Sequence, residues 1–294
     1  MTHLHHAGLG SSRTGLLTLI LIFTALVYLR GWLSHRSHAL RVSSGCRGVS
    51  FLLGLFLIWA AMASPIAALD HELLIIHMLQ HLLLMTLAPP LIWLGLPRAS
   101  MLQAFPQRFV EGVLVPVWQS RASRAIGKIL GRPRFAWLAA CATLIGWHIP
   151  TLFAIGMRSP AWHLFEHTSF LVTGFLFWWP VVQPAGAFRQ DLSVILYLFF
   201  ATLPCDILSG LLVFSDRVVY PMYFSSSHLL GFSPLVDQQC AAALMWTCVT
   251  VVYFVAGAVL TMRLLSPNGL PQVGSLQSKR NPMPPRVEQV LEAH

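Results

Sequence analysis

The chain has 294 residues, of which 56% are hydrophobic and only 10% charged, with a formal net charge of +9. Soluble domains carry about 25% charged residues, so this composition excludes an ordinary water-soluble protein. The basic residues lie between and beyond long apolar runs, where they set membrane orientation, and this distribution argues against nucleic acid as a partner. The sequence therefore predicts an all-α membrane protein.

Seven apolar runs are long enough to cross a lipid bilayer as helices. We expect the spans at 14–33, 48–68, 73–94, 135–153, 162–182, 192–214 and 241–264. Pro89-Pro90 is expected to kink the third span or to end its regular part, and Pro204 is a second candidate for a kink, in the sixth span.

The rest of the chain completes the expected organisation. Residues 1–13 form a flexible, histidine-containing outer segment, and residues 14–266 form the membrane domain. The long basic loop 95–134 mixes apolar and basic stretches, a pattern typical of a helix lying on the membrane surface. Residues 267–294 are polar and contain several prolines, which predicts a disordered cytoplasmic tail.

Lysine and arginine are divided unequally between the two sides of the membrane. If the seven spans alternate in direction, one side carries sixteen of these residues and the other side three. Because cytoplasmic loops are enriched in Lys and Arg, we expect the N-terminus outside and the C-terminus in the cytoplasm. Six or eight spans would not fit this asymmetry.

Histidine has the opposite distribution, with ten of the thirteen histidines outside or in the outer ends of spans. The ten are His3, His5, His6, His71, His77, His81, His148, His163, His167 and His228. Nothing in membrane insertion requires this asymmetry, so it favours a functional explanation.

Two pairs of these histidines share one spacing. His77 and His81 lie in the third span, and His163 and His167 lie in the fifth. A separation of four residues places both imidazoles on nearly one helix face, about 6 Å apart along the axis. His148, at the outer end of the fourth span, is expected at the same depth.

Several imidazoles at one depth suit copper or zinc, and nearby methionines such as Met78 and Met245 favour Cu(I). Glu166, Asp206 and Asp237 are candidates for supporting partners that hold an imidazole tautomer. The sequence thus predicts a metal site in the outer leaflet.

Plainer explanations exist for single residues. One histidine in a membrane helix often only hydrogen-bonds a neighbouring helix, which accounts for His148 alone about as well as a metal does. His3, His5, His6 and His71 could collect metal, but a solvated tail and a solvated turn explain them as well. Two pairs at one depth are harder to explain in this way, because buried polar groups in lipid usually mark a site.

Short motifs are spread along the predicted membrane domain: Ser64-Pro65, His77-Met-Leu-Gln-His81, Ala88-Pro89-Pro90, Leu94-Gly-Leu-Pro97, Trp147-His-Ile-Pro150, Trp162-His-Leu-Phe-Glu-His-Thr-Ser-Phe170, Asp237-Gln-Gln239 and Met245-Trp246. In combination these motifs resemble the multi-span CtaG family of cytochrome c oxidase assembly factors. The resemblance extends from about residue 48 to residue 264.

This resemblance implies a seven-span protein of the bacterial plasma membrane, not an enzyme, that helps a haem–copper oxidase to acquire its copper. Its metal ligands would be His77, His81, His148, His163 and His167, with Glu166 and Asp237 in support. The expected partners are oxidase subunit I and a periplasmic copper chaperone, and the oligomeric state is left open.

Two other functions compete with this interpretation. His163-Leu-Phe-Glu-His167 fits H-x-x-E-H, the inverted zinc-peptidase motif in which Glu166 would be the general base, although a five-residue match is weak. Bis-histidine haem binding is the second alternative. Haem ligands come from facing helices, whereas pairs one turn apart suit a compact ion site better.

Overall fold

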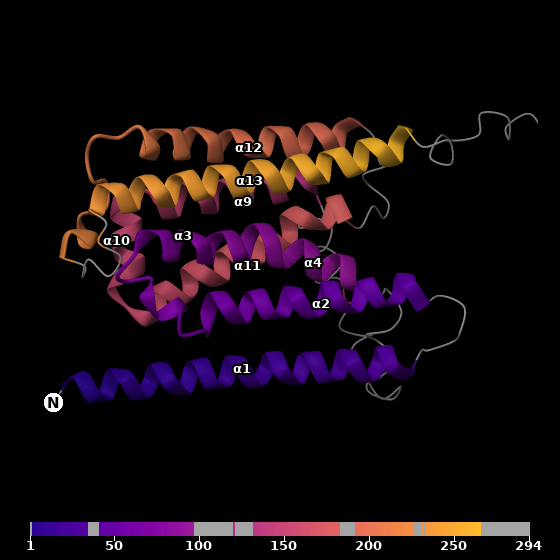
Figure 1. Cartoon of the computed structure of the whole chain (residues 1–294), viewed down its shortest axis with the longest axis horizontal. Coiled ribbons are helices and arrows are strands. Elements are labelled where there is room, and N and C mark those ends of the chain that lie inside the picture. The colour runs from indigo at the N-terminus through magenta and orange to yellow at the C-terminus, as the bar shows by residue number, and fades with distance from the viewer. Residues whose placement is uncertain are drawn as a thin grey trace, which may run out of the picture.

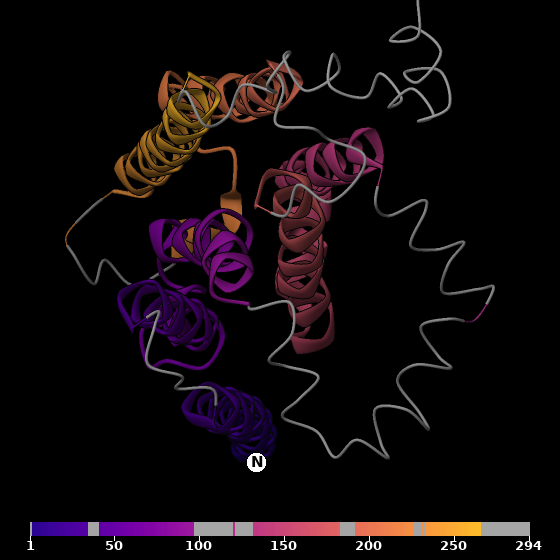
Figure 2. The same ribbon diagram turned by 90° about the vertical axis from the view of Figure 1, so that its right-hand side faces the viewer.

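The computed structural model describes residues 2–34, 41–96, 120, 132–182, 192–225, 231 and 233–265. Within these ranges every regular element is helical, as the composition predicts. The long helices run side by side along one direction (Figure 1), and the end-on view shows them grouped around α3. Figure 2 shows α1 at the edge of this group.

The helices follow the predicted spans closely. Their bounds are α1 Thr2–Ser34, α2 Arg41–Met62, η1 Ala67–Leu69, α3 Leu74–Leu82, η2 Leu83–Leu87, α4 Ala88–Gly95, α9 Pro133–His148, α10 Pro150–Arg158, α11 Pro160–Val182, α12 Leu192–Val213, η4 Pro221–Ser225 and α13 Pro234–Leu265. Helix α1 already begins at Thr2, so the backbone of the expected flexible outer segment continues the first helix.

Five helical stretches are long and apolar enough to cross a membrane, and a sixth is added if α9 and α10 form one bent span. Helix α11 is the remaining predicted span. It has 23 residues and carries His163, Glu166 and His167, and it is not among these five or six stretches. The described part of the chain therefore supports a polytopic membrane protein with five or six clear spans.

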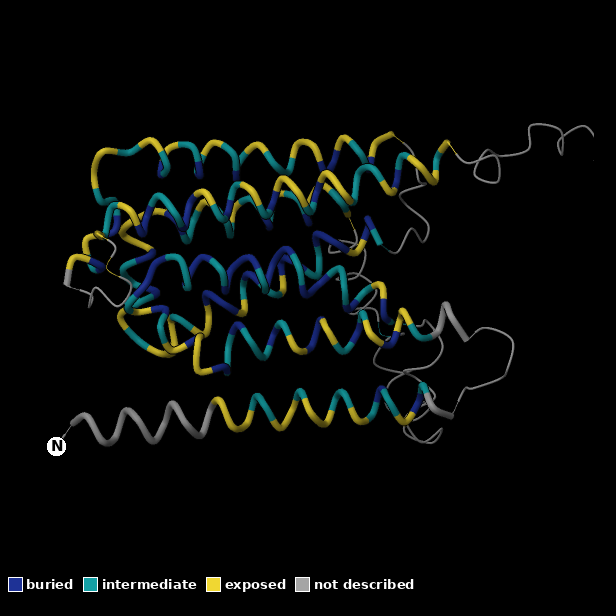
Figure 3. The backbone as a smooth tube through the Cα atoms, in the orientation of Figure 1, coloured by how far each residue is buried: buried dark blue, intermediate teal, exposed yellow. Residues whose placement is uncertain are grey.

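The third span is the centre of the bundle. Of its 18-residue apolar core 61% is buried, compared with at most 28% in the other four continuous spans. Helices α2, α11 and α13 all pack against this span, and Figure 3 shows buried residues concentrated on it while the outer helices expose one face. A lipid-facing helix needs no polar partners, whereas a central helix can carry polar side chains that meet across the bundle.

Within the third span the α-helix changes to a π-helical turn, η2, directly before Pro89-Pro90. Pro89 has no N–H, so it cannot donate to the Met85 carbonyl as an α-helical residue would. The indole N–H of Trp178 donates to that carbonyl at 3.1 Å. The prolines thus interrupt the regular α-helix without ending the span, whereas α12 continues past Pro204 to Val213.

The fourth predicted span, 135–153, is wrong in one respect. Helix α9 ends at His148, and α10 leaves it at an angle of 80°. Ile149 has an extended backbone (ψ 124°), as expected for a residue that precedes a proline. The histidine therefore lies at a helix end, where its side chain meets other helices.

The surface helix expected in loop 95–134 and the tail expected at 267–294 lie almost entirely outside the described residues. Both stay predictions.

Gly174 allows α11 to approach the π-helical turn closely. A Cβ atom at Gly174 would lie 2.8 Å from the Met85 carbonyl oxygen and 2.9 Å from Pro89 Cγ. We expect Gly174→Ala to destabilise the protein by about 1–3 kcal/mol, because the backbone would have to move. The thermal unfolding midpoint of the detergent-solubilised protein measures this effect.

Gly146→Ala in α9 is the matched control, because a Cβ there meets no atom within 4 Å. Its midpoint should stay the same or rise. Equal midpoints for the two variants would contradict the close approach.

Candidate metal centre

The N-terminal part of the third span contributes two imidazoles to one buried cluster. His77 and His81 lie on successive turns of α3, and Glu166 reaches them from α11. Each imidazole Nε2 is 3.4 Å from the same carboxylate oxygen, Oε1 of Glu166. Their side chains are 0%, 5% and 0% exposed, respectively. We call His77, His81 and Glu166 the inner triad.

The polar atoms of the inner triad make no well-aligned hydrogen bond. This holds for both ring nitrogens of His77, both of His81 and both oxygens of Glu166, whose close polar contacts are the two at 3.4 Å within the triad. An unpaired carboxylate in a low-dielectric interior carries a large desolvation penalty unless a positive charge lies beside it. Two imidazole nitrogens and a carboxylate oxygen within 4.8 Å of one another are the donor set that a transition-metal ion takes. The residues present therefore fit a bound cation.

A second group, the outer triad, shares His77 with the first. It consists of Asp70, His77 and His163, and its ligand atoms also lie within 4.8 Å of one another. His163 Nε2 is 3.4 Å from Asp70 Oδ2. The exposed side chain of His71 lies next to it, with Nε2 3.8 Å from Asp70 Oδ1. The outer triad connects the buried inner triad to the surface of the bundle.

The other two predicted ligands, His148 and His167, border the triads. The ring centroid of His167 is 4.2 Å from that of His163 and 5.6 Å from that of His81. His148 lies 6.1 Å from His81, centroid to centroid. All five predicted histidines therefore gather in one cluster. Among the described residues neither triad pairs His163 with His167, the arrangement that the H-x-x-E-H motif would use.

Gln80 connects Asp70 to His167 by hydrogen bonds, a connection that the sequence did not predict. Its amide nitrogen donates to the Ala67 carbonyl at 3.0 Å and to Asp70 Oδ2 at 3.3 Å. Its amide oxygen lies 3.2 Å from His167 Nε2 and accepts from it. The predicted site did not include Gln80 or Asp70. Gln80 could have been predicted from its position about one helical turn after His77, which places both side chains on one helix face.

Asp237 supports the site through the backbone. Its two carboxylate oxygens accept from the N–H groups of Leu74 (2.7 Å) and Ile75 (3.2 Å). These are unsatisfied donors of the first turn of α3, so Asp237 of α13 caps the helix that carries His77 and His81. The predicted role of Asp237 beside an imidazole is replaced by this capping role.

Two tyrosines of the connection before α13 donate hydrogen bonds to backbone carbonyls of the cluster. The Tyr223 hydroxyl donates to the Asp70 carbonyl at 2.8 Å, and the Tyr220 hydroxyl donates to the His148 carbonyl at 3.0 Å. Burial raises the pKa of both phenols far above the usual value, so both stay protonated and keep donating.

Aromatic rings and one glycine fix the imidazoles and the carboxylate. Phe170 stacks on His81 with a centroid distance of 4.0 Å, and Phe153 packs edge-on to His77 at 4.9 Å. A Cβ atom at Gly156 of α10 would lie 2.6 Å from Glu166 Oε2. The bend after His148 thus brings a residue without a side chain against the carboxylate.

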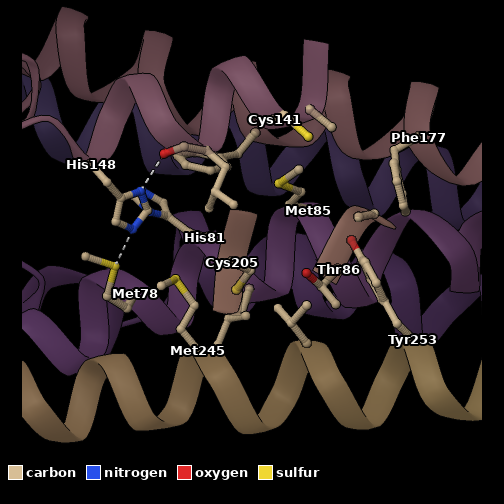
Figure 4. A pocket seen from close by; sticks show the side chains of 16 residues that line it. Met78, His81, Met85, Thr86, Cys141, His148, Phe177, Cys205, Met245 and Tyr253 are labelled. Carbon is tan, nitrogen blue, oxygen red and sulfur yellow. Dashed lines mark hydrogen bonds between the residues drawn. The ribbon is translucent and has the colours of Figure 1, made fainter. Parts of the chain in front are cut away.

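The remaining predicted residues are only partly connected to the cluster. Asp206 is outside both triads, although its Oδ1 is buried without a hydrogen-bond partner. Met78 lies 3.2 Å from His148 Nε2, and Met245 lines the same cavity as His81 (Figure 4). The side chains of His3, His5, His6 and His228 lie outside the described residues.

The fold and the site together define a helical membrane protein with a buried histidine–carboxylate cluster near one end of its bundle. The family model of the cytochrome c oxidase caa3 assembly factor, Caa3_CtaG, matches residues 26–266. The chain therefore belongs to this family, which confirms the resemblance seen in the motifs. No curated protein and no solved structure matches the chain.

Gly156→Ala tests the position of Glu166. The added methyl group would displace the carboxylate from His77 and His81, and we expect the affinity for a bound metal ion to fall about 10–100-fold, as when a supporting residue is lost. Isothermal titration of the purified protein with Zn²⁺ or Cu(I) measures this. Gly146→Ala should leave the affinity unchanged, and an equal affinity in both variants would contradict the role given to Gly156.

Asp237→Ala tests the cap of α3. Two backbone donors would lose their acceptor, and we expect a loss of about 1–2 kcal/mol in stability. The exposed Asp216→Ala is the control and should shift the thermal midpoint little. A normal midpoint for Asp237→Ala would show that α3 needs no cap.

Proposed function

We propose that this protein binds copper at the histidine–carboxylate cluster and delivers it to a haem–copper cytochrome c oxidase during assembly. Membership of the caa3 oxidase assembly family indicates the process in which the protein acts, the assembly of cytochrome c oxidase. The observation that carries the copper step is the buried Glu166 carboxylate, which faces two imidazoles and makes no well-aligned hydrogen bond.

Charge balance supports a cation at this position. The two triads together contain two carboxylates, Asp70 and Glu166, and neutral imidazoles can supply nitrogen ligands without adding charge. When His77 and His81 are neutral, nothing in the inner triad balances the negative charge of Glu166. A bound cation would balance it. Copper is favoured over zinc because the Met78 thioether lies 3.2 Å from Nε2 of His148, a histidine of the same cluster that borders the triads.

The shared residue His77 suggests a route for the ion. An ion held by Asp70 and His163 at the outer triad would already be bound to His77, so it could pass to His81 and Glu166 without losing all its ligands. Such stepwise exchange keeps the charged ion coordinated while it leaves water.

The proposed orientation fits this route. With seven spans and the N-terminus outside, the cluster faces the periplasm, so copper from a periplasmic chaperone reaches it without crossing the membrane. In Figure 1 the N-terminus of α1 lies at the same end of the bundle as α10. Transfer would then run laterally to subunit I of the oxidase in the plasma membrane.

The double variant His77→Ala/His81→Ala tests the proposal. It removes two of the nitrogen ligands, so we expect the purified protein to lose bound copper and the oxidase of the same cells to be copper-poor. Metal analysis of both proteins, with oxidase activity, measures these effects.

Gly146→Ala is the control, because it changes no residue of either triad and a Cβ there meets no atom within 4 Å. Oxidase with normal copper content in cells that carry the double variant would refute the proposed function.

A further inference from the structure

A cavity lies next to the inner triad, between the helices of the bundle. Its volume is about 40 Å³, and His81 and His148 form its outer end (Figure 4). A cavity of this size has room for about two or three atoms or molecules of the size of water. His81 is the only residue of the two triads that lines this cavity, so the proposed copper route does not account for it.

Sulfur dominates the functional groups of the cavity wall. Of the sixteen lining residues, five carry sulfur: Met78, Met85, Met245, Cys141 and Cys205. The whole chain has only 15 methionines and cysteines among 294 residues, so the wall is several-fold enriched in them. Figure 4 shows these side chains on α3, η2, α9, α12 and α13, so they come from most sides of the cavity. No lining residue is an Asp or a Glu.

One contact between two side chains of the cavity wall, His148 and Met78, is unfavourable. His148 Nδ1 lies 2.7 Å from the Leu144 carbonyl, which only accepts, so Nδ1 carries the proton. In the neutral ring Nε2 then holds a lone pair. That lone pair faces Met78 Sδ at 3.2 Å, and thioether sulfur has no proton to donate. Two electron-pair donors therefore point at each other, both nearly fully buried.

A soft cation resolves this contact. Imidazole nitrogen and sulfur bind d¹⁰ ions at about 2.0–2.3 Å, so two donor atoms 3.2 Å apart can both reach one ion. Thioether and imidazole select Cu(I) among the biological metals. These ligands are neutral, and the penalty for burying an ion rises with the square of its charge. The wall therefore favours a monovalent ion over Zn²⁺ or Cu²⁺.

We infer that this cavity is a second metal site, selective for Cu(I). His148 Nε2 and Met78 Sδ are two of its ligands, and the sulfur of Met245 is the candidate for the third. The inference deepens the proposed copper function and rests on it for the identity of the metal. The site is distinct from the triads in chemistry, since the triads supply carboxylate oxygen and the cavity supplies sulfur. His81 belongs to both and links them.

The double variant Met78→Leu/Met245→Leu tests this site, because Met-to-Leu exchanges conserve volume. The probe is Ag(I), a redox-inert analogue of Cu(I), added to the detergent-purified full chain. We expect the wild type to bind one more Ag(I) per chain than the variant. X-ray absorption of the Cu(I)-loaded wild type should show sulfur ligands that the variant lacks, while Zn²⁺ binding stays the same in both.

Two further variants separate the sites. Met62→Leu changes a methionine outside the cavity wall and should retain both Ag(I) and the sulfur signal. His77→Ala/Glu166→Gln should lose Zn²⁺ binding at the triads but retain Ag(I) on sulfur.

The outcomes distinguish the two proposals. Copper bound by the wild type with nitrogen and oxygen ligands only, or equal Ag(I) binding in the Met78→Leu/Met245→Leu variant, would overturn the sulfur site and leave the proposed function standing. A wild type that binds neither Cu(I) nor Ag(I) would overturn both.

Discussion

The carboxylate of Glu166 sits fully buried between two imidazoles, and the surrounding structure is arranged around this one charged group. Burying it is unfavourable in a low-dielectric interior unless positive charge lies close by. Rings on both sides, from Phe153 and Phe170, keep His77 and His81 directed toward it. The bend between α9 and α10 gives the carboxylate room by placing Gly156 against it.

The position of α3 is fixed at both ends by groups from other helices. At its start Asp237 of α13 binds two backbone N–H groups. At its end the π-helical turn is held by Trp178 of α11. Between these two anchors the imidazoles have little freedom, which is what a site needs if it is to bind a metal ion with defined geometry.

The sequence predicted the helices well, because a long apolar run is a local signal that needs no knowledge of the rest of the fold. It also placed the five histidines at one depth, since an i,i+4 spacing fixes side-chain direction on a helix. It did not predict Asp70 or Gln80 as part of the cluster, and it assigned Asp237 a different role. These contacts join residues of separate helices, so they depend on how the helices rotate against one another. The break after His148 was missed although Pro150 follows closely, because a proline can also kink a helix without ending it.

The hydrogen bond from Trp178 to the Met85 carbonyl has an evolutionary consequence. The carbonyl is free because neither Pro89, the α-helical donor, nor Pro90, the π-helical donor, has an N–H. The Trp178 indole can bind the carbonyl only while no backbone donor does. A chain with another residue at position 89 could close the α-helical bond and would have no need of a donor at 178. These two positions, far apart in sequence and on different helices, should therefore change together among homologues.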